Sequence, residues 1–154
     1  MLTELNYYEA YYYLGLIYYK GDRIEIDINK AIYYFLLGAN HDIKSAQFCL
    51  GEIYYDGKYV KQDIEKAINY FKLAAEQNDK NAQYYLGLIY YEGKFIKQDI
   101  EKSIQYFSMA SKQNDSESQY YLGEIYEEGK YIEKDINKAI HYYSLAAKQN
   151  YSKA

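Results

Sequence analysis

Apolar residues recur at helical spacing along this chain, and the whole pattern repeats every 36 residues. In segment 45–56 the apolar side chains fall at steps of three, one, three and one: Ala46, Cys49, Leu50, Ile53 and Tyr54. Steps of three and four bring side chains to one face of an α-helix. The pattern therefore predicts an amphipathic helix here, with counterparts in the other repeats.

Three sets of residues mark the period: Gly15, Gly51, Gly87 and Gly123; Gly21, Gly57, Gly93 and Gly129; and Asp27, Asp63, Asp99 and Asp135. A fixed period of this length is typical of helical repeat arrays. We expect one continuous array with repeats at 9–44, 45–80, 81–116 and 117–152. Residues 1–8 are an N-terminal lead-in, and residues 153–154 begin a truncated fifth repeat.

A second helix follows in each repeat, with recognisable ends. In the second repeat, Gly57 ends the first helix in the left-handed conformation that glycine adopts without strain. Asp63 is a good N-cap for the second helix, and Asn78 occupies the left-handed position after it, as do Asn114 and Asn150. Asp79 and Asp115 then cap the next first helix. In the first repeat, Asn6 and Glu9 form a capping box.

A strand is the competing interpretation of the tyrosine-rich run 11–19, because tyrosine favours sheets. Comparison between repeats decides against it. Positions that are apolar in every repeat fall at helical steps, while a position between them alternates between Leu16, Glu52, Leu88 and Glu124. Each repeat is therefore predicted to be a pair of helices, and the fold to be all-α.

Composition narrows the functional classes. The 154 residues carry a net charge of −4, whereas nucleic acids and anionic membranes attract basic surfaces. No apolar run approaches the ~18–20 residues that cross a bilayer. The N-terminus lacks the basic and apolar segments of a signal peptide, and Cys49 is the single cysteine. These features favour a cytoplasmic protein.

The repeated residues resemble the Sel-1-like repeat of the tetratricopeptide-like superfamily. In the third repeat the matching positions are Ala82, Leu86, Gly87, Tyr90, Gly93, Ile96, Asp99, Lys102 and Phe107. Ser103 and Asn78 depart from the usual alanine and glycine, and tyrosine is unusually frequent. The resemblance implies a right-handed α-solenoid, or superhelix, of four helix-turn-helix repeats. It also implies a protein-binding scaffold or adaptor without catalytic activity.

The sequence gives little support for phosphate binding, metal binding or a reactive cysteine. Gly51, Gly57 and Lys58 resemble the pattern of a phosphate-binding loop. However, the glycine spacing is one residue too long, and Tyr59 stands in place of the Ser or Thr whose hydroxyl would bind Mg²⁺. His41 and His141 lack partners at metal-ligand spacing. Cys49 stands where other repeats have tyrosine and is expected to be a packed thiol. We predict no catalytic residue, no metal and no cofactor.

The same resemblance places the first helix of each pair on a concave groove that binds a partner. Carried over by position, the lining is Tyr12, Leu16, Tyr19, Lys20, Phe48, Glu52, Tyr55, Asp56, Tyr84, Leu88, Tyr91, Glu92, Tyr120, Glu124, Glu127 and Glu128. Tyrosine offers large contact area and a hydroxyl, and carboxylates beside aromatic rings suit Lys or Arg. The expected partner is a protein or peptide with basic and apolar residues. The alternative is a merely solvated acidic face.

Two further possibilities stay open. The outward face of the last helix, with Ile140, Tyr143 and Ala147, lacks a following repeat, which favours end-to-end self-association. The array is alternatively a spacer or regulatory segment of a longer protein, for example one with a kinase. An enzyme like the cysteine-rich Sel-1-like proteins linked to penicillin binding or β-lactamase-like activity is disfavoured, because those carry a cysteine pair in each repeat.

Overall fold

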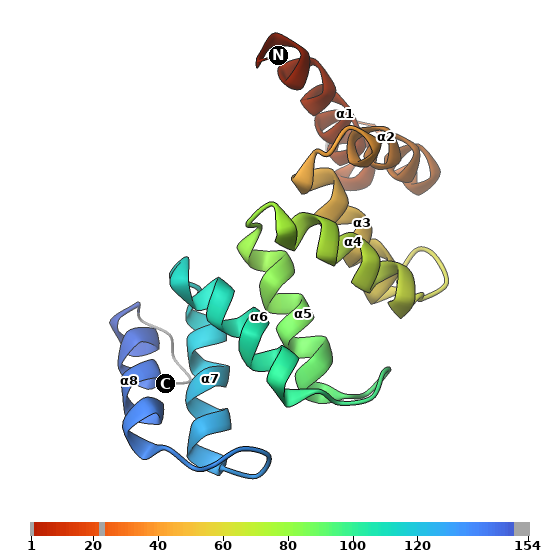
Figure 1. The fold of residues 1–154 in the computed structure, drawn as a ribbon. Helices are drawn as coiled ribbons and strands as arrows, with labels where there is room; N and C mark the ends of the chain where they lie inside the picture. The colour runs from red at the N-terminus through yellow and green to blue at the C-terminus, as the bar shows by residue number, and fades with distance from the viewer. Residues whose placement is uncertain (1, 22–23, 150–154) are drawn as a thin grey trace. The chain divides into compact units, whose positions relative to one another are not determined.

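The computed structural model describes residues 2–21 and 24–149, with side chains from residue 7 onward. Within these ranges it contains eight α-helices and no β-strand (Figure 1). The helices are α1 (Leu2–Lys20), α2 (Ile28–Asn40), α3 (Lys44–Asp56), α4 (Ile64–Glu76), α5 (Lys80–Glu92), α6 (Ile100–Lys112), α7 (Ser116–Glu128) and α8 (Ile136–Lys148). The all-α prediction is confirmed.

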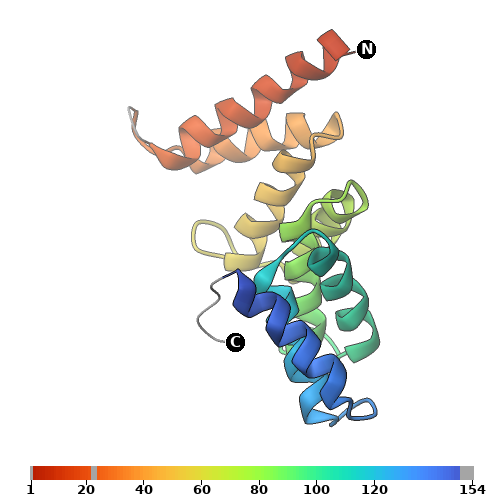
Figure 2. The ribbon, with the colours of Figure 1, turned by 90° about the vertical axis from the view of Figure 1, so that its left-hand side faces the viewer.

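The chain divides into two units, residues 1–82 and 83–154. In the first unit α1 packs on α2, α2 on α3, and α3 on α4; Figures 1 and 2 show α1 and α2 side by side from two directions. In the second unit α6 packs on α7, and α7 on α8. Successive helix pairs stacked in this way are the α-solenoid class that the sequence predicts. The right-handed twist stays a prediction.

The predicted helix ends are present. Asp63 caps α4, its Oδ1 accepting a hydrogen bond from the Lys66 N–H at 3.0 Å. Gly57 follows α3 at φ 63°, and its N–H donates to the Ile53 carbonyl at 3.2 Å. Asn78 also has a left-handed conformation, at φ 59°. A left-handed residue turns the chain away from the helix axis and so ends the helix.

The caps of two first helices are confirmed as well. Asp79 Oδ1 accepts from the Ala82 N–H at 2.9 Å, and Asp115 Oδ1 accepts from the Ser118 N–H at 2.8 Å. Each aspartate satisfies a backbone donor that the helix itself leaves unpaired. The prediction that Asn150 is left-handed, like Asn78, lies outside the described residues.

The predicted start of the first helix is wrong. Helix α1 begins at Leu2 and spans 19 residues, whereas each of the other helices spans 13. Asn6 therefore lies inside the helix and cannot act as its N-cap. Before the first helices of the third and fourth repeats, a left-handed asparagine and a capping aspartate break the chain, and the sequence has no such pair before residue 8.

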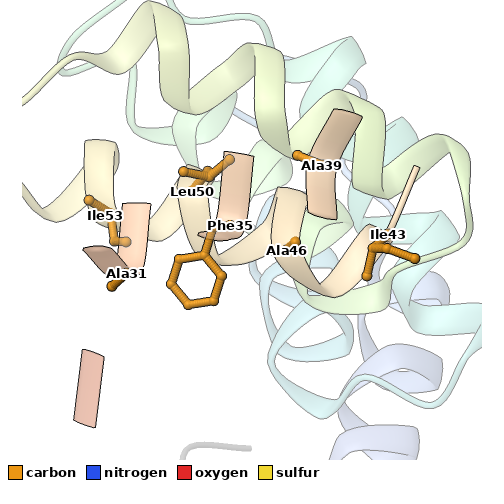
Figure 3. Close-up of a cluster of buried hydrophobic side chains, with 7 residues drawn as sticks. All are labelled: Ala31, Phe35, Ala39, Ile43, Ala46, Leu50 and Ile53. Carbon is orange, nitrogen blue, oxygen red and sulfur yellow. The ribbon is translucent and has the colours of Figure 1, made fainter. Parts of the chain in front are cut away.

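Small and large apolar residues alternate in the core of the first unit. Seven buried side chains form one cluster (Figure 3): Ala31, Phe35, Ala39, Ile43, Ala46, Leu50 and Ile53. The alanines let α2 and α3 approach closely, and Phe35 fills the space between the helices. In the second unit Ile100, Phe107, Leu122 and Ile125 form the corresponding cluster. Phe107, Leu122 and Ile125 stand 72 residues after Phe35, Leu50 and Ile53, so the large side chains of both cores follow from the repeat pattern.

A buried glutamine ties helices together in a way that the sequence analysis missed. Gln47, 1% exposed, donates from Nε2 to the Ala39 carbonyl at 3.4 Å and accepts from Gln77 Nε2 at 2.8 Å. The amide thus links α2, α3 and the end of α4. Gln119 repeats the arrangement in the second unit with the Ser111 carbonyl and Gln149. A buried amide is stabilising only when it is hydrogen-bonded, which both glutamines achieve.

Candidate functional site

The predicted groove residues lie on the face of the first helices that the cores leave partly open. In α3, Phe48, Glu52 and Tyr55 are half-buried and Asp56 is exposed, while Leu50 faces the core. The four groove positions follow the i, i+4, i+7, i+8 spacing of one helix face. We call the sixteen predicted residues the first-helix face.

A cavity of about 340 Å³ opens on this face in the first unit. Six predicted residues line it: Tyr12, Leu16, Tyr19, Lys20, Phe48 and Glu52. The rest of its lining comes from Phe35, Ser45, Cys49, Ile53, Asp79 and Asn81, which the prediction did not include. The cavity is therefore lined by α1, α2, α3 and the start of α5 with the residue before it.

Packing against the core holds the aromatic rings of the cavity. Phe35 is fully buried, and its ring lies 6.3 Å from that of Tyr12 and 6.4 Å from that of Tyr19, measured between centroids. Tyr19 also contacts Tyr59 edge-on at 5.9 Å. Tilted and edge-on rings at such distances attract each other. The aromatic wall is therefore pre-organised.

The cavity has a negative electrostatic character. Burial is the main cause that raises the pKa of Tyr12, and Glu52 and Asp79 raise it further. Burial raises the pKa of the Cys49 thiol to about 12; Glu52 and Asp79 add to this, and Lys20 opposes it. Near neutral pH both groups are uncharged, and the two carboxylates outweigh the single lysine. This arrangement favours a cationic neighbour over an anionic one.

In the second unit, tyrosine hydroxyls donate hydrogen bonds to two carboxylates of the first-helix face. The Tyr91 hydroxyl donates to Glu124 Oε2 at 3.2 Å, and the Tyr143 hydroxyl donates to Glu127 Oε2 at 2.8 Å. Burial, followed by the charges of Glu124 and Glu128, raises the pKa of Tyr91. Tyr120 packs on Tyr143 with centroids 5.7 Å apart. Tyrosines of α5 and α8 therefore contact carboxylates of α7 directly.

The remaining predicted residues have simpler environments. Tyr84 and Leu88 pack half-buried against the second core, whereas Glu92, Glu127 and Glu128 are exposed near the ends of their helices. Partner binding by any of the sixteen residues stays a prediction. Cys49 and Asp79 are two of the six cavity residues that the prediction did not include. The signal for Cys49 was present, because this position holds tyrosine in the other three repeats.

Among the described residues, the side chains considered for metal or phosphate binding do not form such a site. Within residues 2–21 and 24–149, no three His, Cys, Asp or Glu side chains are placed to hold a metal ion. His41 instead stacks on Tyr8, with ring centroids 3.6 Å apart. Gly57 and Lys58 belong to the turn after α3, with Gly57 as the helix-ending residue. No described helix is long and apolar enough to cross a membrane.

Comparison with known proteins connects this architecture to a family. The model of the Sel1 repeat matches residues 9–42, 44–79, 80–115 and 116–151, and thus nearly the whole chain. A search of curated proteins found no match.

Solved structures agree with this family match. A protective antigen of uropathogenic Escherichia coli with an SLR fold is 31% identical, with a TM-score of 0.88, over 97% of this chain and 33% of its own. A Sel1 repeat protein from Oxalobacter formigenes is 33% identical, with a TM-score of 0.85, over 96% of this chain and 60% of its own. The fold is also shared by the cysteine-rich protein B of Helicobacter pylori. This protein is 22% identical, with a TM-score of 0.58, over 75% of this chain and 92% of its own. The chain thus spans about a third of the first of these structures.

Proposed function

Because this chain belongs to the Sel1 repeat family, whose members generally mediate protein–protein interactions, we propose that it is a non-catalytic binding scaffold or adaptor. Its first-helix face holds a segment of a partner protein in the predicted concave groove. The observation that carries this proposal is the cavity of about 340 Å³, around which α1 and α3 gather six of the predicted residues.

The partner segment is basic, with apolar residues between the charges. The first-helix face carries a single lysine, Lys20, and six carboxylates: Glu52, Asp56, Glu92, Glu124, Glu127 and Glu128. Charge complementarity of this kind steers association and selects partners. Half-buried tyrosines beside the carboxylates add contact area and the faces that cations favour. Neither a cofactor nor a membrane takes part, and the location is cytoplasmic.

A peptide array tests this preference with variants that remove charge and keep shape. We expect wild-type protein to bind peptides that contain Lys or Arg, and binding to weaken as salt rises from about 50 to about 500 mM. The variant Glu52→Gln/Glu124→Gln/Glu128→Gln should bind them at least about tenfold more weakly.

The matched control removes three carboxylates elsewhere: Glu65→Gln and Glu101→Gln, in the first turns of α4 and α6, and Glu133→Gln in the turn before α8. It changes net charge equally and should bind like the wild type. If both triple variants bound equally weakly, the loss of binding would be due to overall charge and not to the first-helix face. Undiminished binding by the groove variant would move the site elsewhere.

A spacer or regulatory segment of a longer protein is the second candidate. The chain spans only 33% of the length of the Escherichia coli structure it resembles, so repeats of this kind occur within longer arrays. A spacer needs no specific partner on the first-helix face. The absence of any peptide binding in the array would therefore favour this alternative.

Self-association through α8 is a separate proposal, and it rests on exposed side chains. Ile140 is 59% exposed, whereas its counterpart Ile68 in α4 is 8% exposed. Ala147 is exposed as well, whereas Ala75 is buried. Apolar residues that interior repeats cover are thus open to a second copy. Sedimentation velocity should show a coefficient that rises with concentration, and Ile140→Lys should abolish the rise; a constant coefficient would refute the proposal.

A further inference from the structure

The two units differ in the size of one side chain beside the aromatic cluster of the first-helix face. Cys49 in α3 and Tyr121 in α7 occupy the same place in their repeats, 72 residues apart. Around them the sequence repeats closely, because Tyr12, Tyr19 and Phe35 correspond to Tyr84, Tyr91 and Phe107. A short side chain therefore replaces a phenol ring beside three matching aromatic residues.

In the second unit the Tyr121 ring fills this place. It stacks on Phe107 with centroids 5.1 Å apart and an interplanar angle of 2°. The rings of Tyr91 and Tyr84 lie 5.4 Å and 6.2 Å from it. Three aromatic side chains thus form a seat for a fourth, which packs half-buried against the core.

In the first unit the seat is present and the ring is missing. Phe35, Tyr12 and Tyr19 line the cavity, with Cys49 in its wall. Phe35 holds the two tyrosines at centroid distances of 6.3 and 6.4 Å, and Phe107 holds Tyr84 and Tyr91 at 6.1 and 6.4 Å. The three rings of the first unit thus keep the arrangement of the second unit, although position 49 holds a cysteine where Tyr121 stands in the second unit. The cavity of the first unit is the space that a tyrosine ring fills in the second.

We propose that this cavity binds an aromatic side chain of the partner segment, which stacks on Phe35 as Tyr121 stacks on Phe107, and that a Lys or Arg next to it in that segment faces Glu52 and Asp79. The inference rests on the proposed function and makes it more specific. It names the anchor residue and the place where the anchor docks.

Size and charge both fit such an anchor. A cavity of about 340 Å³ is near the lower end of the range that holds small ligands, roughly 300–1,000 Å³, so it suits one large side chain. Aromatic side chains that fill such pockets carry much of the affinity of protein interfaces. Glu52 and Asp79 line the cavity against one Lys20, which favours a basic neighbour of the anchor.

The aromatic seat is tested with p-cresol, which is the side chain of tyrosine as a free molecule. Wild-type protein and Cys49→Ala, which keeps the cavity, should both bind p-cresol saturably in ligand-observed NMR. Cys49→Tyr restores the residue of the other repeats and should bind at least about tenfold more weakly. Absence of binding to the wild type, or equal binding by Cys49→Tyr, would overturn the inference.

The reciprocal variant protects this test against misfolding of Cys49→Tyr. Tyr121→Cys removes the ring from the second unit and should create a second p-cresol site, which doubles the stoichiometry. Circular dichroism verifies that each variant keeps its helices. A folded Tyr121→Cys protein with a single site would contradict the equivalence of the two seats.

Peptides separate failure of this inference from failure of the proposed function. A basic peptide with one aromatic residue should lose at least about tenfold in affinity when that residue becomes alanine, or when Cys49 becomes tyrosine. If the basic peptide binds and neither change matters, the groove function stands and the aromatic anchor is refuted. If p-cresol binds but no peptide does, the seat stands and the proposed function fails.

Discussion

Replacement of Phe71 by alanine is expected to lower the free energy of unfolding by about 3–5 kcal/mol. Phe71 in α4 is fully buried, and its ring contacts Phe48 at 5.8 Å and Tyr55 at 6.3 Å between centroids. The truncation removes a large apolar surface and leaves a hole between helices that pack closely. Urea denaturation followed by far-ultraviolet circular dichroism measures the change.

Phe95→Ala is the matched control, because it makes the same chemical change at a ring that is 38% exposed. We expect it to cost less than about 1.5 kcal/mol, since much of its surface already contacts water. Similar losses from both variants would mean that Phe71 does not form the core of its repeat.

Replacement of Gly51 by alanine should destabilise the protein by about 1–3 kcal/mol, although alanine is the better helix former. A Cβ at Gly51 would lie 2.5 Å from both Cδ1 and Cε1 of the Phe71 ring. Phe71 is fully buried and cannot move aside without displacing its neighbours. The clash therefore outweighs the gain in helix propensity, which is about 1 kcal/mol.

The Phe71→Ala background provides the test of this cause. Without the ring, Gly51→Ala should become neutral or stabilising, by up to about 1 kcal/mol. Gly51→Ala is then destabilising in the wild type but not in the Phe71→Ala background. A double-mutant cycle measures this difference as a coupling free energy between the two substitutions. Equal destabilisation in both backgrounds would place the cause outside the contact between Gly51 and Phe71.

Most of the fold was predictable because local signals recur four times. Gly57, Asp63 and Asn78 each perform a backbone task that few residue types perform well, and their counterparts among the described residues repeat it. Phe71 and its small neighbours mark the buried face at helical spacing. Four copies separate these constant positions from variable ones, so the sequence predicts helices even where tyrosine favours strands.

Interactions across repeats escaped prediction because they depend on tertiary packing. A polar residue such as Gln47 on a helix gives no sign that its amide will be buried between Ala39 and Gln77. The early start of α1 at Leu2 was missed because Asn6 and Glu9 satisfy the capping pattern without forming the cap.

The candidate site was predictable in part. The family resemblance, carried over by position, assigned Tyr12, Tyr19 and Phe48 to the groove, and these three residues line the same cavity. Asp79 was missed because it was assigned only as a helix cap. Cys49 was recognised as a packed thiol, but the space that a cysteine leaves among three aromatic rings requires coordinates. The use of this face for binding comes from the family and stays a prediction, as do the predicted repeat boundaries.

The most direct test of the binding face is to map where a basic peptide contacts the protein. Amide chemical shifts of ¹⁵N-labelled protein are measured while the tightest peptide from the array is added. We predict that the largest changes fall in α1, α3, α5 and α7, at residues such as Tyr19, Glu52 and Glu124. Changes concentrated in α2, α4, α6 and α8 would contradict the assignment of the first helices as the binding face.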